Sequence, residues 1–350
     1  MAGERYCVIM AGGSGTRFWP VSTTERPKQF VKLASPDSTL LEDAVARASQ
    51  VNGRDNVLIS TGKHLKARSL RTIHGLEEEQ VLAEPTKRNT GGAMVWVVAN
   101  LIARHPEDWK EVTLGVLTAD HRITPTEKFV QDVRIAMEAA ENTGGLVTIG
   151  IRPDRPETGY GYIEEGSAAG RANEVKRFRE KPDLDTAKAF LEAGNFLWNS
   201  GMFFWTLEAF MREMKHAAPD LAEATEQIAE ALKQGDANKA EEIFEGIRGV
   251  SIDYALMEKA EKVLVVEADF DWDDLGAWDA VSRTYMSDSD GNVHLGPSRL
   301  VYTKDSIVYN ESTKQEVAVL GMENVVVVVT DDTVLVVPKN RAQEVKRFTE

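Results

Sequence analysis

The chain has 350 residues and a formal net charge of −15, and 42% of its residues are hydrophobic. This length allows a substantial core and about two domains, or one domain with an appendage. The acidic balance argues against nucleic acid as a partner, because binding to a phosphate backbone needs dense lysine and arginine. It does not exclude a small phosphorylated substrate, since a few cations can make one cleft positive inside an acidic protein.

The number of cysteines and the lengths of the apolar runs indicate where in the cell the protein is located. Cys7 is the only cysteine and lies in an apolar run, so we expect it to pack in a core within a reducing compartment. No apolar stretch approaches the roughly 20 residues that cross a bilayer, and the chain does not open with a signal-type segment. The sequence therefore predicts a cytoplasmic protein with no membrane partner.

Short apolar runs alternate with stretches of helical period through the first two-thirds of the chain. Strands are expected at residues 6–11, 56–61, 80–85, 112–120 and 145–151, and helices at residues 40–50, 91–105 and 126–144. This alternation predicts an α/β fold with a mixed, mostly parallel sheet and helices on both faces.

The amino-acid composition and the pattern of apolar residues change in the last third of the chain. Residues 210–262 are charged and rich in alanine, and we interpret them as a solvated helical flank. From Asn292, short strands separated by turn residues predict a small β-rich appendage that ends in a short helix. The five valines Val325–Val329 are interpreted as a strand buried on both faces. We therefore expect a catalytic domain at residues 1–291 and a β-rich domain at residues 292–350.

A glycine loop, GGSGTRFWP at residues 12–20, follows the first apolar run. Glycines let consecutive backbone N–H groups close around an anion, and Arg17 and Lys28 add cations that suit a triphosphate. No Lys-Ser or Lys-Thr pair follows, so the loop is not a P-loop, and it lacks the third glycine of the dinucleotide fingerprint. A simple tight turn between strand and helix is the alternative.

Carboxylates follow at two places. Asp120 ends the strand expected at residues 112–120, where it could hold Mg²⁺ or cap the next helix. Four acids crowd into residues 269–274, DFDWDD, and a cation would offset their repulsion, whereas an acidic surface turn is the alternative. Because ligands in parallel sheets bind at the carboxyl ends of the strands, we expect Asp120, the glycine loop and residues 83–90 to share one crevice.

A second group of residues suits a sugar phosphate. Gly159, in ETGYGYI, permits a close backbone approach to a sugar ring. Glu180 can accept hydrogen bonds from two hydroxyls and Lys181 can hold a phosphate, although such a pair is also common on surfaces. Asn199 lies among apolar residues and needs a partner, either main chain or ligand. The sequence contains no nucleophile with a matched base. The residues suited to a triphosphate, a metal ion and a sugar phosphate therefore favour a phosphoryl-type transfer, in which the protein positions the substrates and neutralises their charge.

Eight stretches carry a family resemblance, in family order over essentially the whole chain: AGGSGTRFWPVSTTERPKQF, AEPTKRNTGGA, LTADH, ETGYGYIE, FREKP, WNSGMFFW, DWDDLGAW and ENVVVVVTDDTVLVVPKNRAQEVK. They resemble the sugar-1-phosphate nucleotidylyltransferases. The first loop with PKQF is highly specific, and RNT with WNSGMF favours the mannose-1-phosphate guanylyltransferases, or GDP-mannose pyrophosphorylases. Two stretches depart from the family pattern: Gly91-Gly92 stands where Ala-Pro is expected, and DLGAW replaces Asp-Val-Gly-Ser-Trp.

The resemblance implies a GT-A-like, Rossmann-like nucleotide-binding domain with a short left-handed β-helix-like tail. It implies that GTP and α-D-mannose 1-phosphate give GDP-mannose and pyrophosphate, by in-line attack of the sugar phosphate on the α-phosphorus. The resemblance implies that the triphosphate is bound by Gly12, Gly13, Gly15, Thr16, Arg17 and Lys28. It implies that guanine and ribose are bound by Glu84, Arg88, Asn89 and Thr90. Gly159, Glu180 and Asn199 would bind mannose, Lys181 its phosphate, and Asp120 and Asp274 would hold Mg²⁺ or Mn²⁺. Arg17, Lys28, Asp120 and Asp274 would carry catalysis.

The expected partners are GTP and mannose 1-phosphate, and a homodimer is left open. One alternative is another sugar-1-phosphate nucleotidylyltransferase, because pocket shape sets the choice of base and hexose. The other is a catalytically silent subunit that senses a sugar nucleotide. Its absence of catalysis would not explain the residues suited to it, which are Arg17, Lys28, Asp120, Lys181 and Asp274. Some relatives carry a further β-barrel domain for phosphomannose isomerisation. Since this sequence stops at Glu350, we expect no such activity.

Overall fold

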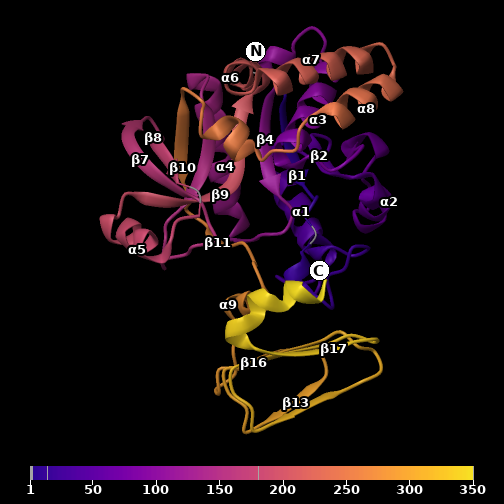
Figure 1. Cartoon of the computed structure of the whole chain (residues 1–350), viewed down its shortest axis with the longest axis vertical. Helices are drawn as coiled ribbons and strands as arrows, with labels where there is room; N and C mark the ends of the chain where they lie inside the picture. Colours follow the sequence, from indigo (N-terminus) through magenta and orange to yellow (C-terminus); the bar gives the residue numbers. More distant parts are fainter. Residues whose placement is uncertain (1–2, 14, 180, 350) are drawn as a thin grey trace. The chain divides into compact units, whose positions relative to one another are not determined.

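The structure is a computed structural model that describes residues 3–13, 15–179 and 181–349. The chain forms two compact units, each with its own hydrophobic core (Figure 1). The first unit comprises residues 1–11, 45–118 and 124–271, and the second comprises residues 12–44, 119–123 and 272–350. The second unit thus joins the C-terminal residues to two earlier segments. The domain boundary expected between residues 291 and 292 stays a prediction.

The first unit is built on a nine-stranded mixed sheet with the order β3-β2-β1-β4-β9-β6-β10-β8-β7. Its strands are β1 (Arg5–Met10), β2 (Val57–Gly62), β3 (Val81–Glu84), β4 (Thr113–Thr118), β6 (Leu146–Ile151), β7 (Tyr162–Ala169), β8 (Ala172–Arg179), β9 (Phe196–Thr206) and β10 (Val263–Glu267). β1 to β4 pair in parallel, as do β6 and β10, whereas β9 runs antiparallel between β4 and β6. All five predicted strands form, and the predicted α/β class is confirmed.

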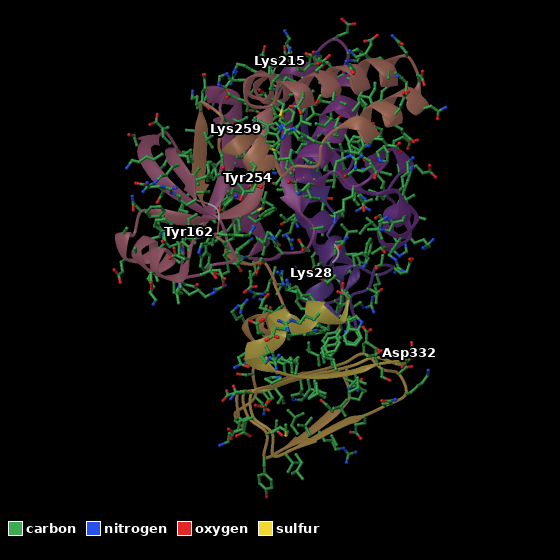
Figure 2. All side chains as sticks on the ribbon, in the orientation of Figure 1. Lys28, Tyr162, Lys215, Tyr254, Lys259 and Asp332 are labelled. Atoms are coloured by element: carbon green, nitrogen blue, oxygen red, sulfur yellow. The ribbon has the colours of Figure 1, made fainter. Side chains whose placement is uncertain are left out.

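Two side chains illustrate the buried part of this sheet. Cys7 on β1 is fully buried, which raises the pKa of its thiol to about 12 and is consistent with a packing role. Tyr162 on β7, labelled in Figure 2, is fully buried as well. The centre of the sheet is therefore covered, whereas most residues of β7 and β8 are partly or fully exposed.

The helices are α1 (Leu40–Asn52), α2 (Lys63–Thr72), α3 (Asn89–Arg104), α4 (Thr126–Thr143), α5 (Leu184–Ala193), α6 (Leu207–Ala217), α7 (Pro219–Lys233), α8 (Ala237–Gly246) and α9 (Val281–Thr284). The three predicted helices correspond to α1, α3 and α4. α3 is apolar on every side because the sheet and α7 both pack against it, and α7 lies beside it in Figure 1. Residues 210–262 do form helices, but α7 and α8 bury Leu221, Ile228 and Phe244 rather than being fully solvated. Among the described residues, no helix is long and apolar enough to cross a membrane.

The second unit contains the predicted β-rich appendage. Its strands are β12 (Val293–Leu295), β13 (Ser298–Val301), β14 (Ile307–Asn310), β15 (Val317–Leu320), β16 (Val325–Val329) and β17 (Val334–Pro338). β12, β14 and β16 stack in parallel, with Val293 opposite Ile307 and Ile307 opposite Val326, and β13 pairs in parallel with β15. Figure 1 shows these strands as successive rungs, which is the arrangement of a β-helix. β5 (Arg122–Thr124) and β11 (Asp271–Asp273) form a separate two-stranded sheet.

The valine strand β16 joins the β-helix to the glycine loop. All five valines are buried, as predicted. Alternate valines face the interior of the coil, and the other two pack in a second core with Phe18, Trp278 and Val345. Phe18 follows the glycine loop, and Val345 belongs to the C-terminal 3₁₀ helix (Lys339–Phe348). One core therefore supports both the loop and the C-terminal helix.

Candidate active site

The glycine loop is shaped by one residue that must be glycine. Gly15 has a φ of 58° and leads into a 3₁₀ turn (Thr16–Phe18). A Cβ on Gly15 would overlap the Cβ of Lys28 and lie 3.0 Å from the Lys28 backbone nitrogen. Apart from the adjoining residues, no atom of the described part of the chain lies within 4 Å of the Cβ position at Gly12 or Gly13. Glycine at position 15 therefore lets the loop approach Lys28 closely.

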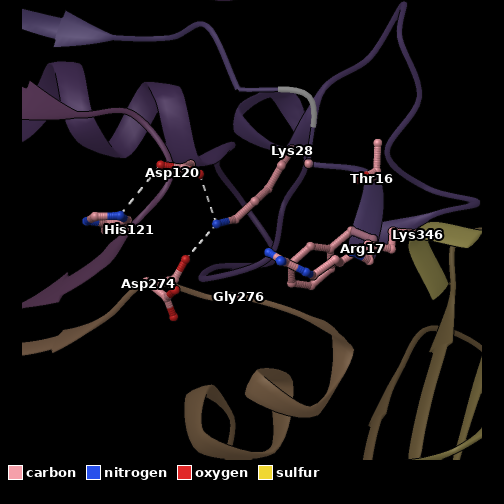
Figure 3. A pocket seen from close by; sticks show the side chains of 10 residues that line it. Thr16, Arg17, Lys28, Asp120, His121, Asp274, Gly276 and Lys346 are labelled. Carbon is pink, nitrogen blue, oxygen red and sulfur yellow. Dashed lines mark hydrogen bonds and ion pairs between the residues drawn. The ribbon is translucent and has the colours of Figure 1, made fainter. Parts of the chain in front are cut away.

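A cavity of about 290 Å³ lies in the second unit beside this loop (Figure 3). The residues that line it are Gly15, Thr16, Arg17, Phe18, Lys28, Asp120, His121, Asp274, Gly276 and Lys346. They come from the glycine loop with its following segment, from residues 119–123, from residues 274–276 and from the C-terminal helix. The cavity thus gathers most of the residues predicted for the triphosphate and both of those predicted for the metal.

Lys28 connects the two predicted metal ligands. Its Nζ donates to Asp120 Oδ2 at 3.0 Å and to the backbone carbonyl of Asp274 at 2.6 Å (Figure 3). The Lys28 side chain is only 7% exposed. Burial is the largest single effect and would raise the pKa of Asp120, but the Lys28 ammonium, His121 and the hydrogen bond from Lys28 together outweigh it, so the pKa lies below its usual value. Asp120 is therefore an anion at neutral pH.

His121 also lines the cavity, and the sequence analysis did not single it out. Its Nδ1 accepts a hydrogen bond from the indole Nε1 of Trp272 at 3.1 Å. The ring proton therefore lies on Nε2, which faces Asp120 Oδ1 at 3.8 Å. Only the tertiary contact with Trp272 reveals this arrangement.

The donor set suits a hard divalent cation that also binds phosphate. Asp120 and Asp274 supply carboxylate oxygens, and Mg²⁺ is commonly held by one or two carboxylates together with substrate phosphates. Within the described part of the chain, no group of three His, Cys, Asp or Glu could hold a metal by itself. A Cβ on Gly276 would lie 3.2 Å from Asp274 Oδ2, so glycine leaves room for this carboxylate. The residues fit a metal site that substrate completes.

The acidic residues next to Asp274 in the sequence do not share its place in the cavity. Asp273 is buried and accepts hydrogen bonds from Arg283 Nε at 2.6 Å and from the N–H of Leu275 at 2.8 Å. This ion pair gives Asp273 a structural role. Asp271 is exposed, although it lies in strand β11 rather than in a surface turn. The four crowded acids therefore do not act as one cluster.

Glu84 ends β3 in the first unit, where it was predicted near guanine and ribose. Its Oε1 accepts a hydrogen bond from Ser60 Oγ at 3.2 Å. Burial raises the pKa of Glu84 to about 7, against smaller opposing effects of Ser60 and Lys87. A carboxyl group with a pKa near neutrality changes its charge readily when a ligand donates to it.

The other predicted base-site residues surround the start of α3. Arg88 donates to the backbone carbonyl of Glu245 at the end of α8, and Asn89 has a φ of 62°. The N–H of Gly91 donates to the carbonyl of Val250 at 2.9 Å, and a Cβ there would lie 2.6 Å from that oxygen. This close approach explains why glycine replaces the alanine of the family pattern.

The predicted sugar-site residues also lie in the first unit, except that Glu180 lies outside the described residues. Gly159 and Lys181 are exposed, and Lys181 has a φ of 44°. Asn199 on β9 accepts a hydrogen bond from the N–H of Gly201 at 3.1 Å. A main-chain N–H is therefore one partner of the Asn199 side chain. This agrees with one of the two alternatives from the sequence, which were a main-chain partner and a ligand.

A segment between α8 and β10 was missed by the sequence analysis. The N–H of Ile252 donates to Thr90 Oγ1 at 2.9 Å, and Asp253 Oδ1 accepts from Asn199 Nδ2 at 3.0 Å. Asp253 begins a π-helix (Asp253–Met257), a geometry common at functional sites. The segment ties a predicted nucleotide residue to a predicted sugar residue. No local pattern marks it, because both contacts join distant parts of the chain.

Comparisons with known proteins identify the family of this chain. Residues 6–290 match the Nucleotidyl transferase family, and residues 299–350 match the MannoseP isomerase/GMP-like beta-helix domain. The chain is 39% identical to a mannose-1-phosphate guanylyltransferase of Escherichia coli K12, over 99% of this chain and 73% of that protein. It is 38% identical to the xanthan biosynthesis protein XanB of Xanthomonas campestris pv. campestris B100, over 97% and 71%. This chain belongs to the nucleotidyl transferase family, among the mannose-1-phosphate guanylyltransferases.

A solved structure extends the family assignment to the fold. The protein of Thermus thermophilus described as a mannose-1-phosphate geranyltransferase matches with a TM-score of 0.88 and 34% identity, over 99% of this chain and 98% of that one. The family resemblance and the β-helix tail expected from the sequence are thereby confirmed. The protein is a nucleotidyltransferase, and enzymes of this family generally use a divalent metal ion.

Proposed function

We propose that this protein transfers GMP from GTP to α-D-mannose 1-phosphate and releases GDP-mannose and pyrophosphate. The observation that carries the proposal is the cavity of the second unit, where Arg17 and Lys28 meet Asp120 and Asp274. Cations suited to a triphosphate and carboxylates suited to a divalent ion are the parts that phosphoryl transfer needs. The names of the relatives support guanylyl as the transferred group and mannose 1-phosphate as its acceptor.

The triphosphate is assigned to the glycine loop and to the two cations. The side chain of Arg17 has no hydrogen bond or ion pair with any described residue, so its guanidinium is available to grip phosphate oxygens in a bidentate manner. Lys28 is already held by Asp120 and therefore presents its charge from a fixed position. Gly12, Gly13, Gly15 and Thr16 are assigned to the same ligand.

The metal is assigned to Asp120 and Asp274, with Mg²⁺ or Mn²⁺ as the ion. When bound, the ion would supply positive charge that offsets the repulsion between the two phosphorylated substrates. Lys28 orients Asp120 through its 3.0 Å contact and fixes the Asp274 main chain through its carbonyl. His121 Nε2 lies 3.8 Å from the other carboxylate oxygen of Asp120.

The chemistry proposed is a direct displacement. An oxygen of the sugar phosphate attacks the α-phosphorus in line, and the bond from that phosphorus to the oxygen of pyrophosphate breaks. No side chain forms a covalent intermediate. Arg17 and Lys28 stabilise the charge that grows on the departing pyrophosphate, which is how preorganised cations accelerate such transfers.

Groups of the first unit are assigned to the base and the sugar. Guanine and ribose are assigned to Glu84, Arg88, Asn89 and Thr90, and the sugar phosphate to Gly159, Glu180, Lys181 and Asn199. The contact of Asn199 with Asp253 supports this, because an amide held at both ends presents a fixed edge to a hydroxyl. The homodimer and the cytoplasmic location stay predictions.

The test is turnover by the purified full chain. Each nucleoside triphosphate is offered with each hexose 1-phosphate in the presence of Mg²⁺, and pyrophosphate release is measured. We expect the highest kcat/KM for GTP with mannose 1-phosphate. A higher value for another pair would identify a different sugar nucleotide synthase. GDP-mannose binding without turnover of any pair would identify a sensing subunit.

A further inference from the structure

The C-terminal 3₁₀ helix (Lys339–Phe348) is firmly attached to the loop that carries Arg17. Val345 is buried in the core of the second unit. The ring of Phe348 stacks on Trp19, with centroids 5.1 Å apart and an interplanar angle of 20°. The helix is therefore part of the wall of the cavity and not a loose tail.

This helix brings an additional cation to the cavity. Lys346 lines the cavity together with Arg17, and neither side chain makes a hydrogen bond or ion pair with another described residue. Lys28, by contrast, is paired with Asp120. Figure 3 shows Arg17 and Lys346 on the side of the cavity away from Asp120. Two uncompensated cations that face one cavity repel each other, and an anion bound between them would offset this repulsion.

We propose that Lys346 is a further substrate-binding residue, which holds the terminal phosphates of GTP and the pyrophosphate that leaves. This inference rests on the proposed function. The metal-binding aspartates mark the other side of the cavity, so the cations far from them suit the distal phosphates. The phosphate of the sugar already has a candidate in Lys181. The β-helix tail thereby contributes a ligand for the leaving group as well as a packing surface.

The test uses Lys346→Ala in the full chain, with Arg347→Ala as the matched control. Arg347 is the next residue, carries the same charge and is paired with Glu344 Oε2 at 3.5 Å. We expect Lys346→Ala to raise the KM for GTP in the forward reaction, and that for pyrophosphate in the reverse reaction, by roughly tenfold, as for loss of a charge-assisted contact. The KM values for mannose 1-phosphate and GDP-mannose should stay within about twofold. Lys346→Arg should retain most of the affinity for pyrophosphate.

Calorimetric titration of each variant with pyrophosphate and Mg²⁺ provides a readout that needs no turnover. Weaker pyrophosphate binding by Lys346→Ala alone supports the assignment. An affinity equal to that of Arg347→Ala would overturn it, as would equal losses for pyrophosphate and for GDP-mannose. A lowered melting temperature that Lys346→Arg does not restore would indicate a structural role instead. If the wild-type protein fails to turn over GTP with mannose 1-phosphate, the proposed function falls, while the pyrophosphate titration still decides the role of Lys346.

Discussion

Replacing Gly15 by alanine is expected to displace Lys28 and disturb the candidate active site. Gly15 holds a left-handed φ of 58°, which alanine adopts only with strain. The new methyl group would overlap the Lys28 Cβ and lie 3.0 Å from both the Lys28 backbone nitrogen and Ser22 Oγ. Because two of these atoms belong to the backbone or lie next to it, the loop or the Lys28 segment must move.

The size of the effect follows from two terms. A left-handed alanine costs about 1–2 kcal/mol, and insertion of a methyl group into a packed site costs about 1–3 kcal/mol. We therefore expect the free energy of unfolding to fall by about 2–5 kcal/mol. Movement of Lys28 would also lengthen its 3.0 Å contact with Asp120. We expect kcat to fall by at least about tenfold, since Lys28 is one of the preorganised charges.

Urea denaturation measures the first effect, and steady-state turnover of GTP with mannose 1-phosphate measures the second. Gly13→Ala is the control for stability, because no described residue other than its chain neighbours has an atom within 4 Å of its Cβ position. Its free energy of unfolding should stay within about 0.5 kcal/mol of the wild type. Unchanged stability of Gly15→Ala would refute the close packing of loop and lysine. A destabilised variant with unchanged kcat would refute the role of Lys28.

Three further substitutions test the other assignments. Asp274→Asn should lower kcat by roughly 10²–10³ and shift its Mg²⁺ dependence with little change in the KM for GTP, whereas exposed Asp271→Asn should do neither. Similar behaviour of the two variants would show that the metal ligands are misassigned. Lys181→Ala should raise the KM for mannose 1-phosphate roughly tenfold and that for GTP much less, with the exposed, ion-paired Lys188→Ala as control. An equal rise for GTP would move Lys181 to the triphosphate. Because folding raises the pKa of Glu84 from 4.5 to about 7, the unfolded chain loses this proton first, and stability should fall as the pH rises through that interval. Glu84→Gln should remove this part of the pH dependence of stability in urea titrations, and an unaltered profile would contradict it.

The sequence by itself determined the features that depend on neighbouring residues. Apolar runs predicted β1 to β4 and β6, because a strand buried on both faces leaves a local signal. The five valines of β16 were interpreted correctly for the same reason. The family was recognisable because the glycine loop and the other motifs are short and ordered along the chain.

Only the tertiary structure decided which chemically equal residues reach the cavity. Asp273 and Asp274 are adjacent and alike in sequence, yet one is paired with Arg283 and the other lines the cavity. Lys346 lies more than 300 positions from Arg17 and joins it only because the C-terminal helix packs in the same core. Contacts of this kind depend on which distant segments pack together, and local periodicity carries no information about that choice.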